Sequence, residues 1–263
     1  MNINDFVALN ENEKPLENIV DDGGYTSIFR TIACIGDSLS SGEFETIKED
    51  GSHGYHDLYD YSWGQYIART CGSKVYNLSR GGMTAKWFLD AMNAKGWGDE
   101  AKKAQAYIVA LGVNDVFGKK MDIGSIDDIS DDPNADVPDT FAGYYGKVLA
   151  YYRTLQPDAK FFLMTMISQS NEEYNAKVKA HSELLYKIAE RYPNTYVLDI
   201  AKYSPMHEGD FRKRFYLNGH LNPMGYVYTA KMVMSYIDYI IRHNYDDFKR
   251  VGLIGTDIKD FSK

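Results

Sequence analysis

The segment Thr31-Ile-Ala-Cys-Ile-Gly36-Asp37-Ser38-Leu39-Ser40 joins a short apolar run to a turn sequence. Residues 32–35 are all apolar and predict a buried strand, and Gly36-Asp37-Ser38 is typical of a turn. We therefore expect Ser38 at the carboxyl end of the first strand, the edge at which open α/β sheets bind ligands. A serine hydroxyl at that edge can act as a nucleophile if a base and oxyanion donors lie within reach.

Strand-like and helix-like segments alternate through the rest of the chain. Further strands are expected at residues 74–78, 106–111, 160–166 and 195–200, and helices at residues 62–71, 84–95, 141–155, 171–192 and 222–243. This alternation predicts a parallel sheet with helices on both faces. We expect one domain over residues 1–263, with residues 1–29 as an N-terminal extension and 244–263 as a C-terminal tail. Residues 42–61 are expected to form a long loop, a feature that often carries function.

The composition excludes several classes of protein. Of the 263 residues, 44% are hydrophobic and 25% charged, and the formal net charge is −8. The negative charge argues against nucleic-acid partners and against binding to an anionic membrane surface. No apolar run is long enough to cross a membrane, and residues 1–6 do not resemble a signal peptide, so a cytoplasmic location is expected. Cys34 and Cys71 are expected to be buried free thiols.

Polar motifs stand where the predicted strands end. Asn77-Leu-Ser-Arg-Gly81-Gly82-Met-Thr84 follows the second strand, Gly112-Val-Asn114-Asp115 follows the third, and Asn218-Gly-His220 precedes the last helix. Each motif has a plain structural explanation when it is taken alone: a tight helix approach, a helix cap or a surface histidine. Their joint occurrence in this order at the strand ends favours a shared functional site.

Together these motifs resemble the SGNH family of serine hydrolases, also called GDSL esterases and lipases, over residues 32–226. The family's four named positions match Ser38, Gly82, Asn114 and His220. Gly81 competes with Gly82 for the second position, and Gly82 is preferred because it stands two residues before Thr84. The resemblance implies a flavodoxin-like three-layer α/β/α fold with a parallel five-stranded sheet.

The resemblance also implies a serine esterase. Ser38 would attack an acyl carbonyl and His220 would take its proton, while the oxyanion would be held by the backbone N–H groups of Ser38 and Gly82 and by the Asn114 amide. Expected substrates are short-chain or acetyl esters of small molecules or carbohydrates, and no metal or other cofactor is expected. A different class of function, a catalytically degraded protein of this fold that binds acylated ligands, remains as the alternative.

The sequence departs from the family pattern at one position. The aspartate that usually stands three residues before the histidine, and that orients its ring, is replaced by Leu217. A remote carboxylate could substitute, with Glu208, Asp210 and Asp199 as candidates. A backbone carbonyl or Asn218 could orient the ring instead, or the enzyme could be weak or inactive.

Three further features have competing explanations. The acidic segment 122–139 includes Asp132-Pro-Asn-Ala-Asp136, which begins like a calcium loop but lacks its glycine and distal glutamate, so a solvated loop that could cover the site is preferred. His53 and His56 are interpreted as solvated histidines rather than a metal pair. The aromatic residues after the nucleophile either pack the loop or offer flat faces to a substrate; they are Tyr55, Tyr59, Tyr61 and Trp63.

Overall fold

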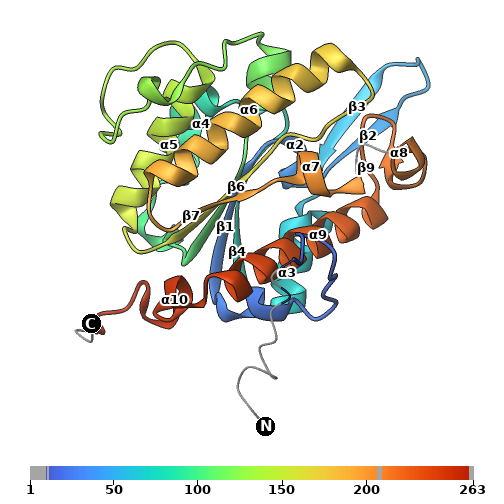
Figure 1. Ribbon diagram of the computed structural model, residues 1–263. Coiled ribbons are helices and arrows are strands. Elements are labelled where there is room, and N and C mark those ends of the chain that lie inside the picture. The colour runs from blue at the N-terminus through green and yellow to red at the C-terminus, as the bar shows by residue number, and fades with distance from the viewer. Residues whose placement is uncertain (1–9, 11, 206–208, 261–263) are drawn as a thin grey trace.

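The computed structural model describes residues 10, 12–205 and 209–260, and a five-stranded parallel sheet lies at its centre (Figure 1). The strands are β1 (Thr31–Gly36), β4 (Lys74–Ser79), β5 (Ala106–Ala110), β6 (Lys160–Met164) and β7 (Thr195–Leu198). Their order across the sheet is β4-β1-β5-β6-β7, and every pairing is parallel. This order is that of a flavodoxin-like doubly wound sheet, so the predicted fold class is confirmed.

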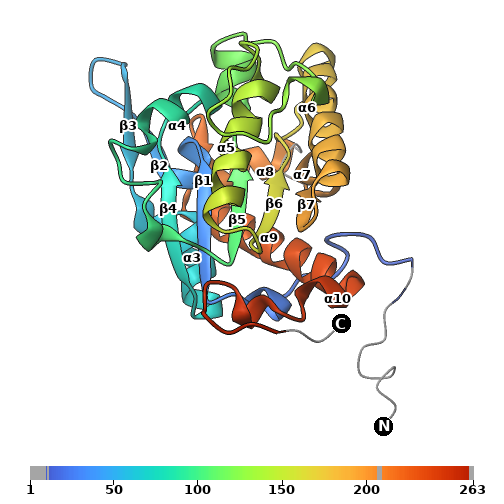
Figure 2. The ribbon, with the colours of Figure 1, turned by 90° about the vertical axis from the view of Figure 1, so that its left-hand side faces the viewer.

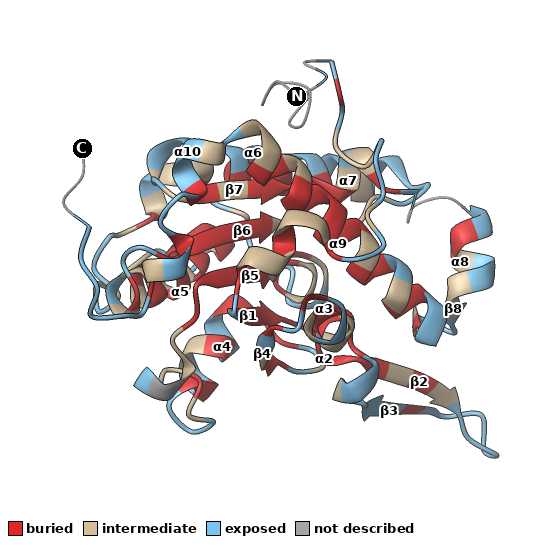
Figure 3. Ribbon diagram, turned by 90° about the horizontal axis from the view of Figure 1, so that it is seen from below, coloured by how far each residue is buried: buried red, intermediate tan, exposed pale blue. Residues whose placement is uncertain are grey.

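Strand β1 contributes side chains to two hydrophobic cores, one on each face of the sheet. Ile32 and Cys34 pack into the first core, whereas Ala33 and Ile35 pack into the second, as the alternation of side chains along a strand requires. Helices α3 (Trp63–Cys71) and α9 (Pro223–His243) cover the first face, and α4 (Ala85–Met92), α5 (Phe141–Leu155) and α6 (Glu172–Arg191) cover the second. The three layers are visible in Figure 2, and Figure 3 shows the buried strands between the helices.

Side-chain caps explain where the helices begin. Ser62, Thr84 and Asn222 precede α3, α4 and α9, and each accepts a hydrogen bond from a backbone N–H of the first turn. The predicted helix at residues 84–95 is shorter than expected, because α4 ends at Met92. Both cysteines are buried and free, as expected.

Residues 42–61 do not form the long loop that the sequence predicts. Strands β2 (Glu43–Ile47) and β3 (His53–Asp57) form an antiparallel hairpin that projects from the main body (Figure 3), followed by the short helix η2 (Tyr59–Tyr61). The hairpin is hard to recognise because the buried residues of β2 are charged: Glu43 and Glu45 are both buried, and Ile47 is exposed. The alternation therefore does not look hydrophobic.

The acidic segment 122–139 is attached to the body by its apolar side chains. Ile123, Ile126 and Ile129 pack against the core under α5 and α6, and Asp131 binds Arg191 and the Tyr192 hydroxyl. None of the residues 122–139 belongs to the wall of the pocket that contains Ser38. The acidic segment therefore does not line the pocket of Ser38 in this structure, because its apolar side chains pack against the helices.

The remaining elements are short. They are η1 (Gly24–Ile28), α2 (Ser38–Ser41), η3 (Glu100–Lys102), η4 (Asn114–Gly118), η5 (Ile126–Asp128), α7 (Ile200–Tyr203), α8 (Gly209–Phe215), β8 (Tyr216–Leu217), β9 (His220–Leu221), α10 (Tyr245–Phe248) and η7 (Val251–Leu253). The N-terminal segment is fastened to α9, where Glu13 forms an ion pair with Arg242 and Tyr25 N–H donates to Asp238. Within the described ranges, no helix has both the length and the apolar character needed to cross a bilayer.

Candidate active site

Ser38 is the first residue of α2 and stands directly after the carboxyl end of β1. Asp37 caps this short helix, because its Oδ1 accepts a hydrogen bond from Leu39 N at 3.1 Å. Burial raises the pKa of Asp37 to about 7. Among the residues that the structure describes, none accepts a hydrogen bond from the Ser38 backbone N–H, which leaves that donor available to a ligand.

Asn114 follows β5 and begins the π-helical turn η4. Its Nδ2 donates to Asp37 Oδ2 at 3.3 Å and to the Met83 carbonyl at 3.2 Å. These bonds connect three strand ends: those of β1, β4 and β5. Asp115 is directed elsewhere, since its Oδ1 accepts from Ala85 N at 2.9 Å at the start of α4, and burial raises its pKa to about 6. The helix-cap explanation therefore fits Asp115, while Asn114 belongs to the site.

Gly82 and Gly81 have different structural requirements. Gly82 has φ +71°, a left-handed conformation that favours glycine, and a Cβ built there would meet open space. A Cβ at Gly81 would instead overlap the carboxylate of Glu43. Gly82 thus leaves space beside its backbone, although it is not among the residues that line the pocket of Ser38, whereas Gly81 makes room for a glutamate.

His220 begins β9, after a two-residue turn that joins it to β8. Its Nδ1 lies 3.0 Å from Glu45 Oε2. The turn also forms two hydrogen bonds with this glutamate. Gly219 N donates to Glu45 Oε2 at 2.7 Å, and Asn218 Nδ2 donates to the Glu45 carbonyl at 2.9 Å. Leu217 pairs directly opposite His220 in the hairpin, and its side chain is exposed. Leucine has no polar atom that could orient the imidazole, so another residue has to do this.

The carboxylate that faces His220 is therefore remote, but it is not one of the three candidates from the sequence. Asp199 accepts from Tyr186 and from the Lys202 backbone at the start of α7. Asp210 is exposed and faces Lys213 on the surface of α8. Glu208 lies outside the described residues. The Asn218 side chain, another candidate, binds the Glu45 backbone instead of the ring.

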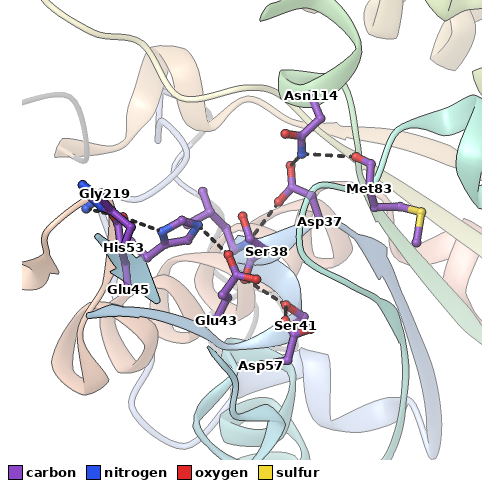
Figure 4. A network of polar contacts seen from close by, with 12 residues as sticks. Asp37, Ser38, Ser41, Glu43, Glu45, His53, Asp57, Met83, Asn114 and Gly219 are labelled. Carbon is purple, nitrogen blue, oxygen red and sulfur yellow. Dashed lines mark hydrogen bonds and ion pairs between the residues drawn. The ribbon is translucent and has the colours of Figure 1, made fainter. Parts of the chain in front are cut away.

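A second glutamate occupies the other nitrogen of the ring. His220 Nε2 lies 3.1 Å from Glu43 Oε1, and the two side chains are only 16% and 11% exposed. Burial by itself lowers the pKa of His220, but hydrogen bonds to Glu43 and Glu45 outweigh it and raise the pKa above its usual value. No hydrogen bond between Ser38 and His220 is present among the described residues. The resting site thus favours an imidazolium between two carboxylates. Figure 4 shows Glu43, Glu45 and Ser38 in one network of polar contacts.

Sequence reasoning gave neither glutamate a role. The detectable signal was their spacing: Glu43 and Glu45 stand at i and i+2, so they share one face of a strand, and Asp50-Gly51 marks the hairpin turn. Glu45 also binds His53 Nδ1. Burial raises the pKa of Glu45, but its contacts with His220 and His53 outweigh this effect and lower that pKa. His53 is therefore a partner of Glu45 rather than a purely solvated histidine.

Ser38, Asn114 and His220 line one pocket of about 280 Å³. Its size is near the lower end of the ~300–1,000 Å³ range of small-molecule sites. Apolar side chains form part of the wall, among them Leu39, Val113, Met164, Met166 and Ile167. Within the described ranges, no group of three or more His, Cys, Asp or Glu side chains is arranged to hold a metal ion.

The aromatic residues near the nucleophile divide between the two explanations. Trp63 is fully buried in the core, whereas Tyr55 is 57% exposed. The Tyr55 ring meets His220 in an edge contact, with the ring centroids 5.8 Å apart. Core packing therefore explains Trp63, and Tyr55 stands as an exposed aromatic face beside the site.

Comparison with solved structures identifies carbohydrate esterases of similar fold. A family 3 carbohydrate esterase from Clostridium thermocellum is 14% identical, with a TM-score of 0.51 over 81% of this chain and 97% of that chain. The acetyl xylan esterase AlAXEase is 19% identical, with a TM-score of 0.52 over 78% of this chain and 98% of that one. A family two carbohydrate esterase from Clostridium thermocellum, in complex with cellohexaose, is 13% identical, with a TM-score of 0.55 over 89% of this chain and 66% of that one.

The family assignment comes from the sequence. No curated protein matches the chain, but residues 34–228 match the GDSL-like lipase/acylhydrolase family. This range includes Ser38, Gly82, Asn114 and His220, the residues that the motifs singled out. The chain belongs to the GDSL-like lipase/acylhydrolase family and is a carboxylic ester hydrolase.

Proposed function

We propose that the protein hydrolyses short acyl esters, with Ser38 as the nucleophile and His220 as the general base. The observation that carries this proposal is that Ser38, Asn114 and His220 line one pocket although they come from three distant parts of the chain. Glu45, through its 3.0 Å contact with Nδ1, is the positioning residue of the imidazole. This replaces the aspartate of the usual triad by a glutamate from the β2–β3 hairpin.

The reaction begins when the Ser38 hydroxyl attacks the ester carbonyl and its proton passes to His220 Nε2. The carbonyl oxygen becomes an oxyanion, held by the N–H groups of Ser38 and Gly82 and by the Asn114 amide. The C–O bond to the alcohol then breaks, and the alcohol leaves with the proton from His220. Water repeats the sequence on the acyl-enzyme, releasing the carboxylic acid and restoring Ser38.

Two contacts of the resting site have to change before this reaction can proceed. Nε2 faces Glu43 in the resting site, so the ring has to lose its second proton and turn its lone pair toward Ser38. Asn114 Nδ2 faces Asp37 and Met83, and has to be shared with the oxyanion. Catalytic hydrogen bonds often tighten only when substrate is bound, and His220 keeps its anchor to Glu45 throughout.

The size of the pocket supports small acyl groups, and acetyl is the proposed one. The structural neighbours include proteins named as an acetyl xylan esterase and as carbohydrate esterases, which supports carbohydrate esters as substrates. The exposed ring of Tyr55 beside His220 supports the same class, because aromatic faces pack against the flat apolar faces of sugars.

The test is turnover of para-nitrophenyl acetate and of acetylated xylo-oligosaccharides by the purified protein. Wild type is expected to release acetate from both, and Ser38→Ala from neither. A catalytically degraded binding protein would retain affinity for the oligosaccharide but release no acetate and would not react with a fluorophosphonate. That result would contradict the proposed esterase and favour the binding function.

A further inference from the structure

The pocket that contains Ser38 has an arginine in its wall. Arg212 lies on the short helix α8 and is half buried. Its guanidinium lies over the ring of Tyr216, 4.4 Å from the centroid, and Tyr216 also lines the pocket. On the same helix, Phe211 is buried and packs against Phe215 with 4.7 Å between the ring centroids. The aromatic contacts hold α8, and with it Arg212, at the pocket.

Arg212 has no acidic partner in the part of the chain that the structure describes. Lys213 on the same helix differs, since it faces Asp210 at 3.7 Å. Asp37 is the only acid among the residues described in the pocket wall, and it is occupied by the Leu39 N–H and the Asn114 amide. Glu43 and Glu45 are directed at His220. Within the described residues, Arg212 is therefore a cation in the pocket wall without an acidic partner.

The wall next to Arg212 is polar and fixed. Tyr174 lines the pocket, and its ring stacks on Phe117 with the centroids 4.0 Å apart. Burial raises the pKa of Tyr174, while a hydrogen bond with Gln169 and the charge of Arg212 oppose that rise. The phenol therefore stays protonated near neutral pH and can donate a hydrogen bond. A planar cation and a phenol that line the same pocket can both donate hydrogen bonds to a carboxylate.

We propose that Arg212 forms a subsite for a carboxylate of the substrate, so that the preferred esters carry a negative charge on their acyl or alcohol part. The Tyr216 ring orients the guanidinium, and the pocket confines the carboxylate to the neighbourhood of Ser38. This inference rests on the proposed ester hydrolysis and adds the substrate class to it. A carboxylate on the alcohol part and one on the acyl part are distinguished by the test.

The test uses two pairs of esters that differ in charge. Para-acetoxybenzoate and para-acetoxybenzamide carry the difference on the alcohol part, and the para-nitrophenyl monoester of adipate and para-nitrophenyl hexanoate carry it on the acyl part. Kinetics are measured for wild type, Arg212→Gln, Arg212→Lys and the control Lys213→Gln, which removes one positive charge from the exposed face of α8. We expect Arg212→Gln to raise KM for at least one anionic ester about ten-fold or more, because a charge-assisted hydrogen bond is lost.

The neutral esters are expected to change by less than about two-fold, Arg212→Lys to be intermediate and Lys213→Gln to behave as wild type. Equal losses on the anionic and neutral esters would assign Arg212 a structural role and overturn the subsite. An equal effect in Lys213→Gln would attribute the preference to the general surface charge and overturn it as well.

A binding measurement separates this inference from the esterase function. Titration calorimetry of para-hydroxybenzoate and para-hydroxybenzamide into the Ser38→Ala protein needs no turnover. We expect the carboxylate to bind more tightly than the amide, and the difference to vanish in Ser38→Ala/Arg212→Gln. If wild type is inactive on every ester but this difference is present, the proposed function is wrong and the subsite is supported. If the two ligands bind equally, and Arg212→Gln raises KM for neither anionic ester, the subsite is contradicted.

Discussion

Glu43 holds the ring nitrogen of His220 that the proposed reaction uses, with Glu43 Oε1 3.1 Å from His220 Nε2. The other nitrogen is held by Glu45 at 3.0 Å. An imidazole can satisfy two carboxylates only when both nitrogens carry protons. The resting site therefore favours the protonated histidine, whereas attack by Ser38 requires the neutral one.

The first prediction concerns the pH dependence of hydrolysis. Glu43 and Glu45 raise the pKa of His220, so kcat/KM should rise with pH and reach half its maximum above the usual histidine value of ~6.5. Glu43→Gln removes one carboxylate and should move this midpoint to lower pH, because the charged ring loses a partner. Glu49→Gln, in the exposed turn of the same hairpin, should leave the midpoint in place. An unchanged midpoint in Glu43→Gln would show that the contact with Glu43 does not set the pKa of His220.

The second prediction concerns the orientation of His220. Glu45→Gln should lower kcat by about 100-fold to 10,000-fold, because an amide no longer selects the reactive tautomer of the ring. KM should change much less, and Glu45→Asp should recover part of the rate. Asp210→Asn serves as the control, since Asp210 is exposed and faces Lys213. Wild-type kcat in Glu45→Gln, or a matching loss in Asp210→Asn, would show that Glu45 is not the positioning residue.

The third prediction concerns the oxyanion donors. Asn114→Ala should lower kcat by about 100- to 1,000-fold with a small effect on KM, because the amide interacts most strongly with the transition state. Asn114 also bonds to Asp37 and Met83, so a thermal melt of the variant is measured alongside to show that it is folded. Unchanged kcat in a folded Asn114→Ala protein would remove this residue from the mechanism.

The fourth prediction separates the two neighbouring glycines. In Gly81→Ala the new methyl group would overlap Glu43, so the glutamate should shift and the pH midpoint should fall as in Glu43→Gln. The double variant Gly81→Ala/Glu43→Gln should show no further shift, since both changes act on one contact. Gly82→Ala should instead lower kcat without moving the midpoint, because φ +71° strains an alanine by about 1–2 kcal/mol. A reversed pattern would exchange the roles of the two glycines.

The main sheet was predictable because its strands are short apolar runs that lie between capped helices. Residues 106–110 are apolar throughout, as expected of a parallel strand buried on both faces. Ser62, Thr84 and Asn222 marked helix starts that the structure confirms. Ser38, Asn114 and His220 were identified because each stands next to such an element, and they line the same pocket.

The glutamates were not predictable in the same way, since their role depends on a contact between parts of the chain that are 175 residues apart. Two buried carboxylates also reverse the hydrophobic alternation of β2, so the hairpin looked like a loop. The position of the acidic segment was missed for a related reason. Its many aspartates predicted a solvated loop, whereas Ile123, Ile126 and Ile129 pack it against the helices.

The most direct test of the central claim is the intact mass of the protein after reaction with a fluorophosphonate at a pH above the midpoint of the activity profile. We expect one covalent adduct on wild type and on Ser40→Ala, whose buried hydroxyl lacks a partner among the described residues. We expect no adduct on Ser38→Ala, together with the loss of ester hydrolysis. Equal labelling of Ser38→Ala, or hydrolysis retained in that variant, would contradict the assignment of Ser38 as the nucleophile.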